Sequence, residues 1–395
     1  MEIVRPVQSE VPARIEAAIA AGQPPDFLFG YQITRGQLER WARENRLADL
    51  ADSVGGFADL FDEDLLDLAT FASGGTDHRA LYALPMGRYT THVHVWLSLL
   101  KRAGFRRQDI PTEWEPFWSF WCDKVQPAVR KALGRDDVWA VGAPMSVEAT
   151  DTRRGLRQFV YAYTEAWPTP DGPNLLRDPA ARTVLVKGLE TYAAIYKKGC
   201  TPPDAVDWTN RGNNKAFLEW RVVMTMNNTL SIPNGLKHEH PDAYYRNAIT
   251  IGWPKDVFGR PERIAGGYYQ AVVFKDGGHA AAAEDLVRFL VRDGWLAQYL
   301  MSAGDRLLPP SRRMLDQPFW LDTRDPHRLQ AVMQAMTQPH VWSHYGLDQE
   351  QEARLEREHG FAALSAAVHR VVVDGLTPEQ AADEAIARVH QILSE

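Results

Sequence analysis

An α/β fold is predicted by the spacing of apolar residues along this chain of 395 residues. Short apolar runs of strand length alternate with segments of helical period over about the first three-quarters of the sequence, and the last part is helical. Such alternation is typical of helices that connect strands, with mostly parallel sheets. The length suits two domains of roughly 100–200 residues each. No linker rich in Pro, Gly and Ser divides the chain, so ordinary strands must join any two domains.

The composition is that of a folded, soluble protein. Apolar residues make up 45% and charged residues 24%, close to the globular averages of about 45–50% and 25%. The net charge is −7 without a block of Lys and Arg, which argues against a nucleic-acid surface. No apolar run approaches the roughly 20 residues of a membrane span. The N-terminal "MEIVRPVQSE" lacks the features of a secretory signal, which by itself predicts a cytoplasmic protein.

The first elements follow from periodicity and capping residues. An apolar stripe over 11–19 predicts a helix that stops at Gly22, before two prolines. The short apolar strand "DFLFG" then ends at Gly30. Thr34 and Gln37 have the spacing of a capping box and predict the start of a second helix.

Two strands and an aromatic helix come next. The strands are expected over 81–87 and 90–96, and the helix begins at a predicted capping box of Thr112 and Glu115. Its apolar residues recur with helical period at Trp114, Phe117, Trp118, Trp121 and Val125. This stripe could be a ligand platform or a face buried against a sheet, and the helical period favours burial.

The remaining elements continue the alternation. Strands are expected over 138–146, 221–226, 248–254 and 268–274, and helices over 185–200, 214–219 and 280–300. The helix over 280–300 would turn Leu286, Phe289, Leu290 and Leu296 inward. The last helix has Thr377 as its cap, Pro378 at its first position and Gln380 closing a capping box.

Motifs of covalent or metal chemistry are mostly missing. The sequence has no Walker loop, no GxGxxG and no GxSxG, and we expect no cofactor. His92 and His94 share a strand face, and His238 and His240 flank an acid, but neither pair has a third ligand at a recognisable spacing. Hydrogen-bonded or solvated histidines are therefore favoured over a metal site.

An acid pair suitable for glycoside hydrolysis cannot be singled out among 51 acidic residues. Glu148 and Asp151 lie on the polar loop "SVEATDT", where acids are more often solvated. An enzyme therefore stays an alternative without positive support.

A series of segments, in order, carries a family resemblance. They are "AAIAAGQPPDFLFG", "LYALPMG", "HVWLSLLKRAG", "IPTEWEPF", "NNKAFLEWRVVMTMNN", "GGYYQAVVFKDGGHAAAAEDLVRFL" and "LTPEQAADEA". The series resembles the family-1 extracellular solute-binding proteins of ABC importers, the group that contains the maltose-binding protein. Trp220 stands where the family has a glycine, and Leu230 where an aromatic residue often follows a strand, so sugar stacking is not expected there.

The resemblance implies two α/β lobes joined by crossing strands, with a ligand cleft between them that closes by a hinge. The first lobe would comprise 1–100 and 248–305, and the second 101–247 and 306–395. It implies a non-enzymatic receptor of an ABC importer that captures a sugar or polyol. The receptor would be monomeric and periplasmic or extracellular, and its partners would be the membrane permease subunits.

The predicted ligand site follows from a rule of open α/β sheets, in which ligands bind beyond the carboxyl ends of strands. The strand "DFLFG" would present a polar aromatic end to the ligand. The full set of predicted ligand contacts is Tyr31, Gln32, Met86, Arg88, Ser146, Glu148, Trp208, Asn227, Asn228, Trp253, Gly267 and Tyr268. Amides, a carboxylate and rings suit a neutral, polyhydroxylated ligand.

Two other functions stay open. One is a binding protein for a non-sugar solute, such as an amine or a glycerophosphate. The other is a cleft enzyme that acts on glycosides. A turnover assay separates the enzyme, and a fluorescence ligand screen separates the two kinds of solute.

Cys122 and Cys200 both fall in the second predicted lobe. They are either two buried thiols or a disulfide, which export would allow and which needs Cα atoms within about 7 Å.

The N-terminus departs from the family, because the resemblance places a first strand and helix before "EIVRP". We therefore expect an N-terminally shortened form of an exported receptor. Residues 2–5 would then have no partner, and the strand at 81–86 would keep an open edge.

Overall fold

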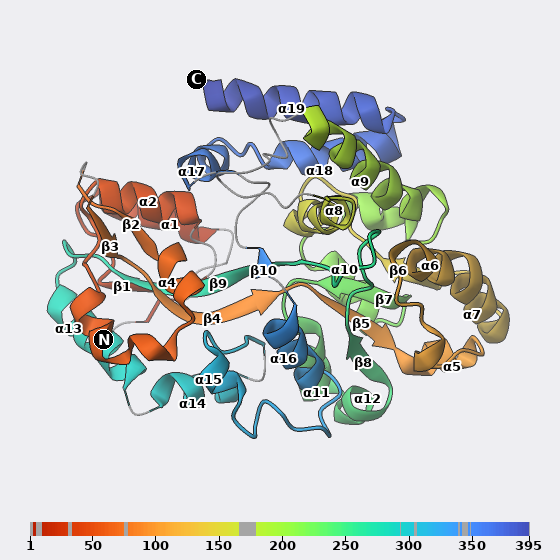
Figure 1. Cartoon of the computed structure of the whole chain (residues 1–395), viewed down its shortest axis with the longest axis horizontal. Helices are drawn as coiled ribbons and strands as arrows, with labels where there is room; N and C mark the ends of the chain where they lie inside the picture. The colour runs from red at the N-terminus through yellow and green to blue at the C-terminus, as the bar shows by residue number, and fades with distance from the viewer. Residues whose placement is uncertain are drawn as a thin grey trace. The chain divides into compact units, whose positions relative to one another are not determined.

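The computed structural model describes residues 3–4, 10–30, 34–74, 78–165, 179–292, 294–303, 306–338, 340–341, 347 and 349–394. The chain divides into two compact units (Figure 1). Unit 1 comprises Met1–Tyr89 and Gly267–Gln317, and unit 2 comprises Thr90–Gly266 and Pro318–Glu395. The first two passages between the units fall within strands β4 (Leu84–Thr90) and β9 (Ile264–Val273).

These boundaries differ from the expected ones. Segments 90–100 and 248–266 belong to unit 2, and 306–317 belongs to unit 1. The first difference has a clear cause, because β5 (His92–Trp96) and β8 (Ala248–Ile251) pair within the sheet of unit 2.

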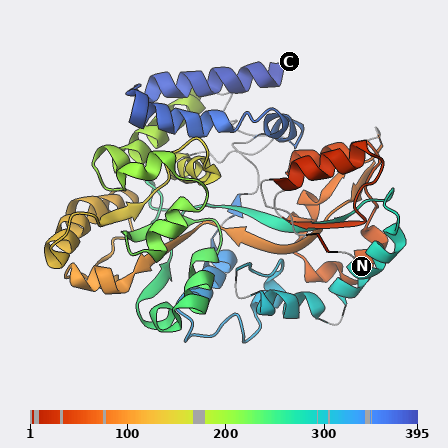
Figure 2. The same cartoon turned by 180° about the vertical axis from the view of Figure 1, so that it is seen from behind.

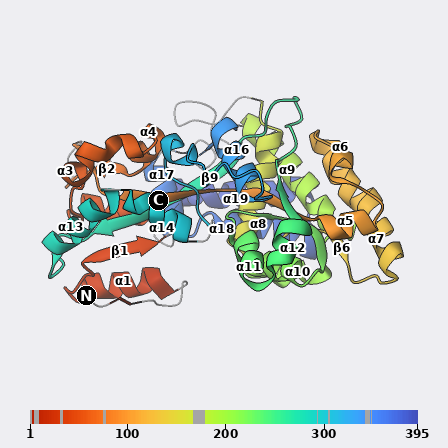
Figure 3. The same ribbon diagram turned by 90° about the horizontal axis from the view of Figure 1, so that it is seen from below.

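Unit 1 is built on β9, which pairs antiparallel with β1 (Phe27–Gly30) and also pairs with β4. Its other elements are α1 (Val11–Ala20), α2 (Arg35–Arg43), α3 (Ala51–Val54), a 3-10 turn at Gly55–Leu60, α4 (Glu63–Leu68), β2 (Thr70–Ala72), β3 (Arg79–Leu81), α13 (Ala280–Val291), α14 (Trp295–Ser302) and α15 (Arg312–Leu315). Helix α1 lies alongside β1 (Figure 3). Ile15 of α1 and Trp41 of α2 share one buried core with Val272 of β9.

Unit 2 contains a sheet of order β6-β7-β5-β8, with β6 at Trp139–Gly142 and β7 at Val222–Asn227. Its helical elements are α5 (Leu97–Arg102), α6 (Trp114–Ser119), α7 (Gln126–Leu133), α8 (Thr150–Ala162), α9 (Pro179–Lys197), α10 (Gly212–Leu218), α11 (Ser231–Glu239), α12 (Pro241–Arg246), α16 (Arg328–Thr337), α17 (Gln349–Arg357), α18 (Ala362–His369) and α19 (Pro378–Ser394). Short 3-10 helices lie at Arg107–Asp109 and Pro203–Asp207, and π-helical segments lie at Phe120–Val125 and Arg370–Asp374. The short strand β10 (His340–Val341) pairs parallel with the start of β9.

The expectation of mostly parallel sheets is wrong. In the sheet of unit 2 only β6 and β7 run parallel, while β5 is antiparallel to both of its neighbours. Apolar runs reveal that a strand is buried but not its direction, because both directions bury side chains in the same way.

The helices of unit 2 bury the predicted aromatic stripe. Trp114, Phe117, Trp118, Trp121 and Val125 are between 0% and 8% exposed and belong to one core. The C-terminal helices α18 and α19 lie side by side and add to that core (Figure 2). The interpretation of the stripe as a buried face is confirmed.

Two of the three predicted capping boxes are present. Gln37 N donates to the Thr34 hydroxyl at 3.2 Å, and Thr34 N donates back to the Gln37 side chain at 3.0 Å. The equivalent bonds join Thr377 and Gln380. The third prediction is wrong, because α6 has Glu113 as its N-cap and no side-chain cap.

The helix expected over 280–300 is two helices. α13 ends at Val291 and α14 starts at Trp295, preceded by Gly294 with a left-handed φ of 73°. The buried face of α13 is Ala283, Val287 and Val291, so Phe289, which we expected inward, is 47% exposed, whereas Leu296 of α14 is buried as expected. Likewise, the strand expected over 81–87 is divided between β3 and β4.

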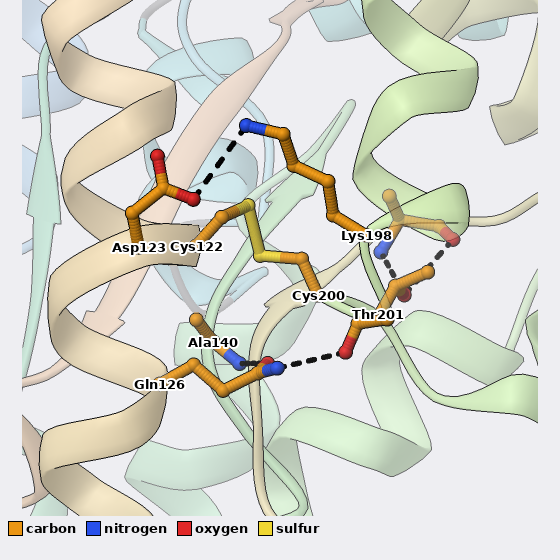
Figure 4. The surroundings of a disulfide bond; sticks show 9 residues. Cys122, Asp123, Gln126, Ala140, Lys198, Cys200 and Thr201 are labelled. Carbon is orange, nitrogen blue, oxygen red and sulfur yellow. Dashed lines mark hydrogen bonds and ion pairs between the residues drawn. A yellow bond between two sulfur atoms is a disulfide. The ribbon is translucent and has the colours of Figure 1, made fainter.

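A disulfide joins Cys122 and Cys200, with 5.2 Å between their Cα atoms (Figure 4). It ties the helical segment after α6 to the end of the turn that follows α9. Gln126 reinforces this junction, since its side chain donates to the Gly199 carbonyl and accepts from the Ala140 amide. Of the two alternatives for the cysteines, the structure shows the disulfide.

The N-terminal segment is described only in part. Ile3 and Val4 are 62% and 65% exposed and belong to no strand, whereas residues 2 and 5 lie outside the described residues. The prediction of a shortened N-terminus therefore stays a prediction.

Candidate ligand-binding site

A polar cluster lies at the carboxyl ends of β6 and β7 in unit 2. The two strands are parallel, with Gly142 opposite Thr225, so their carboxyl ends meet at one edge of the sheet. Helix α8 starts beyond β6, and Asn228 follows β7. This edge is where an α/β sheet of this kind places its ligand contacts.

A chain of hydrogen bonds crosses this edge. The Thr91 hydroxyl donates to Asn228 Oδ1 at 2.8 Å, and Asn228 Nδ2 donates to Asp151 Oδ1 at 2.7 Å. The Thr91 carbonyl accepts from Trp253 Nε1 at 2.9 Å and from Gln334 Nε2 at 2.8 Å. All five residues are at least nine-tenths buried, so this chain of hydrogen bonds runs beneath the protein surface.

The loop before α8 is held by backbone contacts. The Ser146 hydroxyl donates to the Trp208 carbonyl and accepts from the Ala149 amide. Asn210 Oδ1 accepts from the Thr150 hydroxyl at 2.9 Å. Ser146 and Trp208 are buried, whereas Glu148 and Asn210 are exposed at the same edge. The exposed pair is thus accessible to a solute.

The predicted amides are already engaged. Asn227 Nδ2 donates to the Ser231 hydroxyl, and its Oδ1 accepts from the Asn228 amide N–H. Asn228 bonds on both sides, to Thr91 and Asp151. Trp253 donates its N–H to Thr91 and stacks against Trp114 with ring centroids 6.2 Å apart. The polar groups of these three predicted contacts are therefore bonded to other residues of unit 2.

The surroundings of Asp151 shift the pKa of its carboxyl group. Burial raises the pKa of its carboxyl group, and the nearby Arg154 guanidinium, 3.6 Å away, opposes that rise. The sequence pattern suggested a solvated acid, but only 9% of Asp151 is exposed.

The predicted contacts in unit 1 have structural partners. Met86 and Arg88 are buried in the middle of β4 rather than beyond its end. The Arg88 guanidinium pairs with Asp62 and donates to the Pro309 carbonyl at 2.7 Å. Arg88 therefore ties β4 to a neighbouring segment of unit 1.

Gly267 and Tyr268 lie inside β9, not before it. A Cβ atom on Gly267 would lie 2.2 Å from the Tyr89 hydroxyl oxygen, so only glycine fits without movement. The Tyr268 hydroxyl donates to the Leu68 carbonyl at 2.9 Å, and its ring packs against the core of unit 1. Tyr31 and Gln32 lie outside the described residues.

The paired histidines of β5 are buried. His94 Nδ1 shares the Thr250 hydroxyl with His327 Nδ1, at 3.0 Å and 2.8 Å. Burial lowers the pKa of His94 well below its usual range and that of His327 to about 4. Within the described part of the chain no three acidic, histidine or cysteine side chains gather as a metal site would require.

Sequence reasoning missed the burial and the hydrogen bonds of Thr91 and Asp151. Thr91 lies before β5 in a stretch that reads as plain strand, and its partners come from residues 137 to 243 positions away. Asp151 carries a usable signal, because an acid in the first turn of a helix that follows a strand lies at the ligand edge of the sheet.

Solved structures with the same fold include sugar-binding proteins of ABC transporters. A solute-binding protein from Thermotoga lettingae, solved with α-D-tagatose, has a TM-score of 0.76 at 16% identity over 98% of this chain and 90% of that chain. A maltose-bound MalE3 of T. maritima has a TM-score of 0.73 at 15% identity, covering 97% and 89%. The GacH receptor of Streptomyces glaucescens, solved unliganded and with acarbose, has a TM-score of 0.76 at 14% identity, covering 99% and 90%.

No protein-family model and no curated protein sequence matches the chain. At 14–16% identity the structural likeness shows the fold, and the predicted resemblance to the maltose-binding-protein group is confirmed at that level. The chain has the fold of ABC-transporter solute-binding proteins.

Proposed function

We propose that this protein is the substrate-binding receptor of an ABC importer and that it captures a neutral sugar or polyol. The proposal depends chiefly on likeness along nearly the whole chain to receptors solved with tagatose, maltose or acarbose. The edge of unit 2 supports it, since hydroxyl, amide and carboxylate groups gather there. Such groups recognise hydroxyl-rich ligands by hydrogen bonds.

The receptor is proposed to act outside the cytoplasm, as a monomer that delivers its solute to membrane permease subunits. The disulfide supports this location, because such bonds persist in oxidising compartments. None of the described helices has the length and apolar character needed to span a bilayer. We propose no catalytic role, since the fold's solved relatives named above are transport proteins.

The test is a ligand screen by calorimetry and tryptophan fluorescence with maltose, D-tagatose and acarbose. We expect micromolar binding of at least one sugar, a fluorescence change, and no hydrolysis of nitrophenyl glycosides. Small-angle scattering with the bound sugar should show a smaller radius of gyration if binding closes the two units by a hinge. Binding without any change in scattering would refute hinge closure, and sustained turnover would refute the receptor.

A further inference from the structure

We infer that the guanidinium group of Arg157, in helix α8 of unit 2, is a binding site for a small oxyanion, a sulfate, phosphate or carboxylate group. This inference goes beyond the proposed receptor function and does not rest on it. It follows from a buried positive charge that the described part of the protein leaves unpaired.

The first observation is this buried cation. Only 4% of Arg157 is exposed, and its Nε and Nη1 atoms are enclosed without a hydrogen-bond acceptor. Within the described ranges, no carboxylate pairs with the guanidinium group. A buried charge without a partner is strongly destabilising, and native proteins rarely keep one. Water accepts N–H groups but leaves the charge unbalanced, whereas an oxyanion satisfies both.

The second observation is the charge of the helix around Arg157. Arg153 and Arg154 precede it by four and three residues, so the three side chains are neighbours on the surface of α8. Asp151 is the only acid in α8, and it pairs with Arg154 at 3.6 Å. The Arg153 guanidinium lies over the ring of Phe361, 5.9 Å from its centroid. Positive charge therefore exceeds negative charge along this part of α8, which favours an anion.

The shape of the group selects an oxyanion rather than a halide. Nη2 is not among the enclosed nitrogens, and no described residue accepts a hydrogen bond from it, so a small molecule can reach this end of Arg157. Nη2 also forms a fork with each of the two other nitrogens. Two oxygen atoms of one sulfate, phosphate or carboxylate group can bind such a fork side by side, which a chloride ion cannot do.

The experiment measures binding of sulfate to the full chain by equilibrium dialysis. We expect one saturable site in the wild type and none in Arg157→Met, which keeps an unbranched side chain and removes the charge. The matched control is Arg182→Met in α9. Arg182 is partly exposed and pairs with Asp383, so this variant should bind sulfate as the wild type does.

Thermal unfolding gives a second readout. Sulfate at about a hundred times its dissociation constant should raise the midpoint of the wild type by about 3 °C more than that of Arg157→Met. Sodium chloride at equal ionic strength is the reference, and the variant corrects for the general stabilisation of proteins by sulfate. In chloride alone, Arg157→Met should be at least as stable as the wild type, because it removes an unpaired buried charge.

Further probes separate two sources of the oxyanion. Phosphate represents a free anion, and D-glucuronate represents an acidic group carried by a sugar, with D-glucose as its neutral control. Binding of sulfate and phosphate that Arg157→Met abolishes assigns the site to a free anion. Binding of glucuronate alone, also abolished in Arg157→Met, assigns it to an acidic solute and contradicts the neutral solute of the proposed function.

Two results overturn the inference: wild type and Arg157→Met respond alike to all three oxyanions, or the wild type binds none of them. If Arg157→Met does not fold, Arg157→Lys replaces it. Lysine keeps the charge without the fork and should weaken binding about tenfold. Failure of every neutral sugar in the ligand screen would count against the receptor and leave the oxyanion site in place, because sulfate binding is measured without a sugar.

Discussion

Trp220 occupies a position whose backbone favours glycine. It follows α10 with a φ of 60°, in the left-handed region that commonly ends a helix. Its ring stacks on Trp96 with centroids 3.9 Å apart, and Trp96 in turn stacks on Phe217 at 5.0 Å. The side chain thus covers a fully buried tryptophan while the backbone is strained. The two effects oppose each other, since left-handed strain costs about 1–2 kcal/mol and an aromatic pair contributes about 1 kcal/mol.

This opposition predicts an order of stability for two variants. Trp220→Gly loses the stacking but relieves the backbone, whereas Trp220→Ala loses the stacking and keeps the strain. We expect the alanine variant to be less stable than the glycine variant by about 1 kcal/mol. Urea unfolding followed by circular dichroism measures both. Equal midpoints would show that the strain at this position is negligible.

At the scale of elements, strand pairing and the disulfide organise unit 2. β6 and β7 are parallel neighbours, and their carboxyl ends create the polar edge. Cys200 lies next to this pair, because its carbonyl accepts from the Val141 amide of β6 at 3.0 Å. The bond to Cys122 therefore ties the α6–α7 helical run to the segment that lies beside β6.

Removal of the disulfide should destabilise unit 2 strongly. The cysteines are 78 residues apart, and closing a loop of that size contributes about 4.5 kcal/mol in the chain-entropy account. We expect Cys122→Ala/Cys200→Ala to lower the free energy of unfolding by about 3–5 kcal/mol. Alkylation of the unreduced protein before mass spectrometry should label neither cysteine. Dithiothreitol should destabilise the wild type but not the double variant; two labelled thiols in the native protein would contradict the bond.

At the scale of the whole molecule, buried ionisable groups set the response to pH. Burial lowers the pKa values of His94 and His327, so both histidines are neutral in the folded state. The lowering of His327 is opposed by Asp325 and aided by Lys237. Burial raises the pKa of Glu262 well above its usual range, which acts in the opposite direction. The contribution of one group to the pH dependence of stability is therefore measured by comparing the wild type with a variant that lacks that group.

The sign for His327 follows from linkage. Its folded pKa of about 4 lies below the value of 6.5 for an exposed histidine. The unfolded chain binds more protons between these values, so the contribution to stability is full above pH 6.5 and is lost as the pH falls toward 4. The difference corresponds to about 3 kcal/mol.

His327→Gln removes this titration. We expect the variant to lose less stability than the wild type between pH 6.5 and 4, although it is less stable at pH 7 because its contacts with Thr250 and Tyr244 are disturbed. Urea midpoints at half-unit pH steps measure the difference. Parallel pH curves for the two proteins would show that His327 does not contribute.

Local patterns in the sequence were sufficient for features that depend on near neighbours. The buried stripe from Trp114 to Val125, the capping boxes at Thr34 and Thr377, and the strand that ends at Gly30 all follow from spacings of a few residues. The order of family-like segments was sufficient for the fold, which the solved structures confirm.

Only the tertiary structure decided what depends on distant partners. The direction of β5 is set by its pairing with β7. Arg88 is buried against Asp62, which lies 26 positions away in the sequence. The hydrogen bonds from Thr91 through Asn228 to Asp151 join residues that are 137 and 77 positions apart. A carboxylate in a polar loop reads as solvated until packing excludes water from it. Burial is a property of the assembled unit, and for this reason the burial of Asp151 could not be predicted from its sequence neighbours.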